Sequence, residues 1–136
     1  MVIRLIKLLI LFSFFSCSSS GKRLELEVLV KDTVQVDEKV LARIYSNNSD
    51  WEIIKAYFDC EENPMSDKIN VLNETIEGCV KELFVRNDTI VIQFVPAKLG
   101  PAEFGNIKVL MKKKAEEYKV LESGFNYVVV KGQVNN

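Results

Sequence analysis

The sequence contains no histidine, and among its 136 residues it has only three prolines, six glycines and one tryptophan. Histidine is the usual general base near neutral pH and a frequent metal ligand, so its absence weighs against catalysis and against a tetrahedral metal site. The small number of prolines and glycines excludes a collagen-like or low-complexity chain. We therefore expect a globular protein that is not an enzyme and that carries no metal or other cofactor.

An excess of positive charge is also missing. The chain has 18 basic and 19 acidic side chains, which gives a net charge of −1. Proteins that bind nucleic acids usually carry clustered basic residues that neutralise phosphates. Nucleic acid is therefore not an expected partner.

The first 16 residues differ from the rest of the chain. Arg4 and Lys7 are followed by an apolar run from Leu8 to Phe15, and the small residue Ser16 comes next. This order is typical of a secretory signal peptide, whereas a membrane-spanning helix needs about 20 apolar residues. Cleavage after Ser16 would leave 120 residues, the size of one domain.

We divide the chain into a signal peptide (1–16), a flexible tether rich in serine (17–23) and a single domain (24–134). The string Phe14-Phe15-Ser16-Cys17 resembles the lipobox of bacterial lipoproteins, in which the cysteine is lipidated at cleavage. The resemblance implies a lipid anchor on Cys17, and Ser18 resembles the outer-membrane sorting signal. The expected location is the periplasmic face of the outer membrane.

Once Cys17 is assigned to the lipid, the remaining cysteines form a pair, Cys60 and Cys79. An even pair in an exported domain indicates one disulfide. Closing a loop of about 20 residues would stabilise the fold by roughly 3 kcal/mol on the chain-entropy model. The alternative is two buried free thiols.

Short apolar segments, several with alternating polar residues, recur along the domain and predict strands. These segments are 24–30, 40–45, 68–72, 80–86, 89–95, 104–111 and 118–130. Residues 51–60 fit either a strand or a helix, and their β-branched and aromatic content favours a strand. Asn87-Asp88 predicts a tight hairpin turn, since both residues tolerate positive φ. The number and spacing of the strands predict an all-β sandwich.

Three segments carry a family resemblance. They are Phe94-Val95-Pro96-Ala97-Lys98-Leu99-Gly100, Phe104-Gly105-Asn106-Ile107-Lys108-Val109 and Phe125-Asn126-Tyr127-Val128-Val129. They resemble the end of the periplasmic Ig-like repeats in the shaft protein of the gliding and type IX secretion machinery. The resemblance implies a single Ig-like β-sandwich of about seven strands, in a secretion or gliding assembly of the cell envelope.

Three groups of residues are candidates for a binding site. Glu61, Glu62 and Asp67 offer oxygen ligands for calcium, although they lack an EF-hand pattern and also fit a solvated turn. Lys112-Lys113-Lys114 is a basic run suited to anionic headgroups, and Glu116-Glu117 cancel much of its field.

The third group is aromatic. Trp51 and Tyr57 alternate with Ile54 and Phe58, which predicts either a recognition platform or a buried core. Taken together, these features favour a non-catalytic interaction or scaffold module with a protein partner in the envelope. The alternative is an accessory lipoprotein that binds a small ligand or an ion, with the acidic residues as the candidate site.

Overall fold

The computed structural model describes residues 23–62, 67–114 and 116–132, and this part of the chain contains strands and no α-helix. The strands are β1 (Leu26–Leu29), β2 (Thr33–Gln35), β3 (Val40–Ser46), β4 (Trp51–Phe58), β5 (Ile69–Asn70), β6 (Thr75–Ile76), β7 (Glu82–Arg86), β8 (Thr89–Phe94), β9 (Gly100–Lys113) and β10 (Glu117–Val130). Within these ranges no helix is long and apolar enough to cross a membrane. The predicted signal peptide, Cys17 and most of the tether lie outside the described residues.

Eight strands are hydrogen-bonded in the order β1-β3-β8-β7-β4-β9-β10-β2. The order has a weak point between β7 and β4, which share only the pairs Ala56–Leu83 and Tyr57–Glu82. The sheet folds over at this point, and its two halves share one apolar core. The halves β1-β3-β8-β7 and β4-β9-β10 match the two sheets of an Ig-like sandwich. The predicted all-β sandwich is therefore confirmed.

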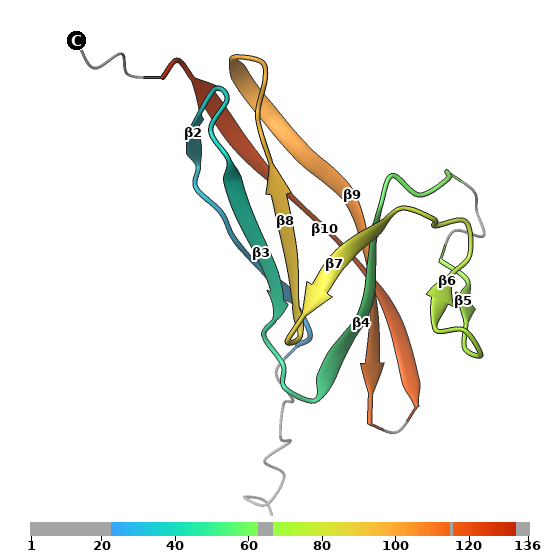
Figure 1. Cartoon of the computed structure of the whole chain (residues 1–136). Coiled ribbons are helices and arrows are strands. Elements are labelled where there is room, and N and C mark those ends of the chain that lie inside the picture. Colours follow the sequence, from blue (N-terminus) through green and yellow to red (C-terminus); the bar gives the residue numbers. More distant parts are fainter. Residues whose placement is uncertain (1–22, 63–66, 115, 133–136) are drawn as a thin grey trace, which may run out of the picture.

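The first two strands belong to different halves of the sandwich. β1 pairs antiparallel with β3, whereas β2 pairs parallel with β10. The N-terminal segment thus passes from one sheet to the other, as a single strand interrupted by residues 30–32. Counted in this way, the sandwich has seven strands, and the short β5–β6 pair stands beside it (Figure 1).

The main core lies between the two sheets and follows the alternation of the strands. On β3, Ala42 and Ile44 are fully buried, while Leu41 and Tyr45 on either side of them are exposed. The residues buried in this core are Ala42, Ile44, Trp51, Ile53, Ala56, Ile90, Ile92, Ile107, Val109, Met111 and Phe125. Because side chains on a strand alternate between its two faces, the same alternation leaves a second set of residues on the outer surfaces.

An aromatic cluster closes one end of the core. The rings of Phe104 and Phe125 are stacked with centroids 5.4 Å apart, and Phe94 lies 5.1 Å from Tyr127. Offset and tilted aromatic contacts of this kind are favourable beyond their apolar area. The cluster joins β8, β9 and β10, which are the strands that include the three segments of the family resemblance.

A second core lies on the outer face of the β4-β9-β10 sheet. Tyr57 and Leu110 point away from the sandwich interior, and both are buried beneath residues 59–62 and 67–81, which we call the excursion. Ile76 and Cys79 of the excursion complete this cluster. The excursion therefore covers the outer face of one sheet.

The base of the excursion is closed covalently. Cys60 and Cys79 are joined with their Sγ atoms 2.03 Å apart, and the backbone N–H of Glu61 donates to the carbonyl of Gly78. Gly78 has a φ of 82°, a conformation that residues with a Cβ rarely adopt. The two ends of the excursion are thus held side by side, next to β4 and β7.

One predicted strand is shorter in the structure than expected, and the segment with two possible interpretations forms the favoured strand. The strand predicted over 68–72 is reduced to Ile69–Asn70 because its partner in the hairpin, β6, is equally short. The segment that fitted either a helix or a strand is strand β4. A bulge between Ile53 and Lys55 shifts its alternation, and this shift explains the helix-like spacing of its apolar residues.

The Asn87-Asp88 turn forms as predicted, with φ values of 49° and 58°. Asp88 also has a role outside the turn, because its Oδ1 accepts a hydrogen bond of 2.6 Å from the backbone N–H of Ile53. That contact ties the β7–β8 hairpin to β4 beside the bulge.

The disulfide gives a stability prediction. In a Cys17→Ser background, the additional double replacement Cys60→Ala/Cys79→Ala should lower the free energy of unfolding by roughly 3 kcal/mol, since it removes the constraint on the unfolded chain. Urea unfolding of both proteins measures the difference. Thiol titration of the unfolded Cys17→Ser protein should find no reactive thiol, and two thiols per chain would contradict the bridge.

Candidate interaction surface

One row of side chains crosses the outer face of the β1-β3-β8-β7 sheet. Register places Leu29 opposite Arg43, Arg43 opposite Val91, and Val91 opposite Phe84. All four positions alternate with core residues on their own strands, so their side chains point to solvent. The row therefore runs from the edge strand β1 to β7.

Large apolar and aromatic side chains are exposed on this surface, together with Arg43 and with Glu27, which lies opposite Tyr45. Phe84 is 62% exposed and Leu29 is 58% exposed, while Leu41 and Tyr45 are close to 40%. We call the surface formed by Leu29, Leu41, Tyr45 and Phe84 the bare face. Contiguous exposed apolar surface is uncommon on monomeric proteins and marks interaction sites.

Two arginine side chains lie on the strands that carry the bare face. Arg43 lies within the row, and Arg86 is paired with Thr89 at the end of β7. Neither arginine forms an ion pair with another described residue. Aromatic residues and arginine are enriched at the centres of protein interfaces, so the composition of this face fits a protein partner.

The two outer faces of the sandwich therefore differ. On the β4-β9-β10 sheet, Tyr57 and Leu110 are covered by the excursion. On the other sheet, no described segment covers Phe84 or Leu29. The chain supplies a cover for one apolar face and leaves the other open.

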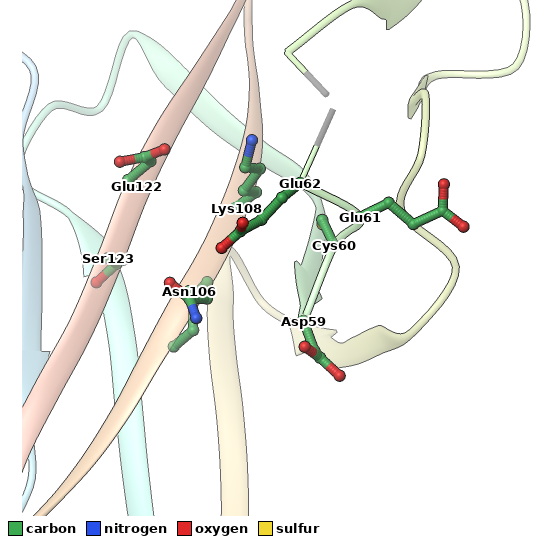
Figure 2. Close-up of a pocket in the computed structure, with 9 residues that line it drawn as sticks. Asp59, Cys60, Glu61, Glu62, Asn106, Lys108, Glu122 and Ser123 are labelled. Carbon is green, nitrogen blue, oxygen red and sulfur yellow. The ribbon is translucent and has the colours of Figure 1, made fainter. Parts of the chain in front are cut away.

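The predicted acidic site lies at the start of the excursion, where Glu61 and Glu62 line a hollow of about 310 Å³. Its other walls come from β9 and β10 and include Lys108 and Glu122. Figure 2 shows that Asp59 and Glu61 are directed away from these strands, whereas Glu62 points toward β9. The carboxylates do not converge on one point.

Part of the negative charge of this acidic loop is paired with a lysine. Lys108 Nζ lies 2.7 Å from Asp67 Oδ1, and the lysine side chain is only 14% exposed. Among the described residues there is no group of three or more carboxylates and cysteines placed to hold a metal ion. Residues 63–66 of the acidic loop lie outside the description. The geometry gives the calcium hypothesis no support.

The lysines of the basic run at the β9–β10 turn contact different partners. Lys112 donates to Glu74 Oε1 at 2.8 Å, and the Tyr118 hydroxyl donates to the same oxygen at 3.0 Å. Both hydrogen bonds lower the pKa of Glu74, and the bond from Lys112 has the larger effect. The same bond raises the pKa of Lys112. Lys112 thus fastens the turn of the excursion to the sheet.

Lys113 and Lys119 have a different partner. Their ammonium groups lie 5.9 Å and 5.1 Å from the centre of the Trp51 ring, within the range of cation–π attraction. Trp51 itself is buried in the main core, and Tyr57 is buried beneath the excursion. The two rings therefore serve separate cores, and the hypothesis of an aromatic recognition platform is wrong.

The hydroxyl of Tyr57 is an unusual feature of the second core. Its Oη is buried and has no hydrogen-bond partner among the described residues. Burial raises the pKa of Tyr57, and the nearby charge of Glu82 adds to the rise. Tyr57 packs in this core with Ile76, Cys79 and Leu110.

The sequence matches no protein-family description and no curated protein. Among solved structures, the chain is similar to superoxide reductase (neelaredoxin) from Ignicoccus hospitalis, with 13% identity, a TM-score of 0.38, and coverage of 77% of this chain and 80% of that one. Two variants of that protein match with 15% and 14% identity and TM-scores of 0.38 and 0.36. At such TM-scores the likeness assigns neither a fold nor an activity to this chain.

These matches nevertheless correct one expectation. The absence of histidine led us to expect a protein that is not an enzyme. The matching structures bear the name of a reductase, which is an enzyme, and this contradicts the expectation. We therefore withdraw it, and no activity is assigned to the chain in its place.

The bare face is not apparent from the sequence alone. Leu41 and Phe84 stand in strands whose alternation was recognised, but alternation alone does not say which face is covered. The available signal was a pair of apolar residues, Leu41 and Tyr45, on the same face of one strand as Arg43. Cross-strand register was needed to bring Phe84 and Leu29 into the same surface.

The Glu74 contacts predict a pH effect. The pKa of Glu74 is lowered in the folded state, so its contribution to stability is present above its usual value of 4.5 and is lost as pH falls through the lowered value. Glu74→Gln should be less stable than the parent at neutral pH, and the difference should shrink as the pH falls from about 4.5 through the lowered pKa of Glu74.

Urea unfolding across this pH range measures the difference. Glu62→Gln is the matched control, because Glu62 forms no ion pair with a described residue, and it should follow the parent protein. A gap between Glu74→Gln and the parent that stays constant with pH would contradict the assignment.

Proposed function

We propose that the protein is a lipid-anchored interaction module of the bacterial cell envelope. It is held at the periplasmic face of the outer membrane through Cys17, and it binds a protein partner through the bare face. The observation that supports this proposal is the exposed apolar surface around Phe84 and Leu29 on a domain that covers its other sheet. An uncovered face of this kind is typical of a surface with a partner.

The residues of the bare face indicate what kind of partner would bind there. Phe84 and Tyr45 supply large rigid contact areas, which are frequent among residues that dominate binding energy. Arg43 lies between Leu29 and Val91 without an ion pair among the described residues. The expected partner is an envelope protein that offers an apolar patch bordered by carboxylates, so that Arg43 is paired when its surroundings are desolvated.

The family resemblance directs the search for this partner. Three segments at the end of the domain resemble the Ig-like repeats of the gliding and type IX secretion shaft protein. Secretion and gliding assemblies are therefore the first place to look for the partner. Both kinds of assembly operate at the cell envelope, where a lipid on Cys17 would hold the domain.

Anchoring is tested by replacing the proposed lipid acceptor. Cys17→Ser should move the protein from the membrane fraction to the soluble fraction, since stable anchoring requires the acyl chains that this cysteine would carry. Fractionation and labelling with a radioactive fatty acid provide the measurements. A Cys17→Ser protein that still sediments with membranes and takes up label would refute the anchor.

Partner binding is tested on the bare face. Phe84→Glu should reduce recovery of cross-linked partner from membranes by about tenfold or more, because it places a charge within the proposed contact. Val80→Glu is the control, since Val80 is 86% exposed and precedes β7, outside the residues that define the bare face. The experiment purifies each variant through a C-terminal tag and identifies the cross-linked proteins.

The outcomes separate the possibilities. Loss with Phe84→Glu and retention with Val80→Glu would support the proposal. Equal recovery from both variants, or recovery of no partner from the parent protein, would overturn it. Cross-links that join two copies of this chain would replace the envelope partner by self-association.

A further inference from the structure

The described chain begins at one end of the sandwich and is fixed there. The Asn47 side chain bridges two points, because its Nδ2 donates to the carbonyl of Arg23 at 3.0 Å and its Oδ1 accepts from the backbone N–H of Glu25 at 2.8 Å. The backbone of Asn47 also donates to the Glu25 carbonyl. Any tether to the membrane therefore leaves the domain beside the turn that joins β3 to β4.

The tip of the β9–β10 hairpin lies at the same end. Lys113 pairs with Trp51, the first residue of β4, so the tip stands next to the β3–β4 turn (Figure 1). Lys113 and Lys119 lie over the Trp51 ring, and Lys114 is exposed. Three lysines thus lie at the end of the domain where the chain enters, and Asp50 and Glu52 line the same hollow as two of them.

The turn of the excursion adds apolar groups to this end. Leu72, in the turn between β5 and β6, is 96% exposed, and Val71 beside it is 57% exposed. Glu74 follows in the same turn and is held by Lys112, next to the β9–β10 tip. With the disulfide at the base of the excursion, this contact fixes a turn that presents leucine to solvent.

We propose that this end of the sandwich, with Leu72 and the lysines at the β9–β10 tip, lies against an anionic phospholipid bilayer. The inference rests on the proposed anchor at Cys17. Five residues lie between Cys17 and Arg23, and even a fully extended chain spans only about 20 Å from one to the other. The anchor therefore keeps this end within reach of the headgroups.

The residues at this end suit such a surface. A leucine exposed in water gains by entering the apolar part of the interface, and lysines place their ammonium groups among anionic headgroups. Glu116 and Glu117 stand at the same tip and weaken its positive field over a Debye length of about 8 Å. The lysines therefore orient a domain that the lipid anchor already holds at the bilayer. They do not by themselves recruit the domain to the membrane.

The opposite end of the molecule would then face away from the bilayer. β9 has 14 residues, so its two ends lie about 45 Å apart. Leu99 immediately precedes β9 and is 60% exposed at the far end. The bare face stands along the side of the domain, where a partner in the periplasm can reach it.

Trp51 is the only tryptophan of the chain and lies at the proposed contact end, so it serves as a built-in donor. The lipidated full-length protein is reconstituted into vesicles of phosphatidylcholine and phosphatidylglycerol that carry a dansyl headgroup acceptor. Energy transfer from Trp51 should be severalfold greater than transfer from a tryptophan at the far end, provided by Trp51→Phe/Leu99→Trp.

Two variants test the contact itself. Leu72→Glu and Lys113→Glu/Lys114→Glu should each lower transfer from Trp51, and the lysine variant should do so only when phosphatidylglycerol is present. Val80→Glu is the control on the excursion and should leave the transfer unchanged.

Equal transfer from Trp51 and from the far-end tryptophan would overturn the orientation. Transfer that neither variant lowers would overturn the lipid contact and leave a domain held by its tether alone. Failure of the parent protein to associate with vesicles would instead refute the anchor on which the proposed function depends.

Discussion

Burial of β4 and β9 on both faces is the constraint on which the rest of the structure depends. Their inward side chains, such as Ala56 and Val109, form the main core, while Tyr57 and Leu110 on the opposite face are also fully buried. A strand pair in the middle of a sandwich normally has one face in water. This pair requires a cover, and the excursion with its Cys60–Cys79 closure provides it.

The same arrangement separates three surfaces. The excursion covers the outer face of one sheet, the bare face around Phe84 remains open on the other, and the end near Trp51 gathers the chain entry and the lysine tip. On the proposed function, each surface has a different neighbour: the protein's own excursion, a partner protein and the bilayer. Glu74 connects two of them, because it fastens the excursion beside the tip that would face the membrane.

Local patterns predicted most of the sandwich. Alternation located β3, and the two residues of the Asn87-Asp88 turn adopt the positive φ that their short polar side chains tolerate. The second core was harder to predict, although the uninterrupted run Val109-Leu110-Met111 is the signal of a strand buried on both faces. The bare face was not predictable, because an exposed Phe84 and a buried aromatic residue give the same local pattern until the register of the strands is known.

The central claim is that the bare face is covered by a partner in the envelope and open in the isolated protein. Hydroxyl-radical footprinting of the full-length protein, in intact envelopes and after purification, tests this claim most directly. The account predicts that Phe84 and Tyr45 lose reactivity in envelopes, whereas Leu99, which is exposed at the far end, reacts equally in both. Equal reactivity of Phe84 in the two states would contradict the account.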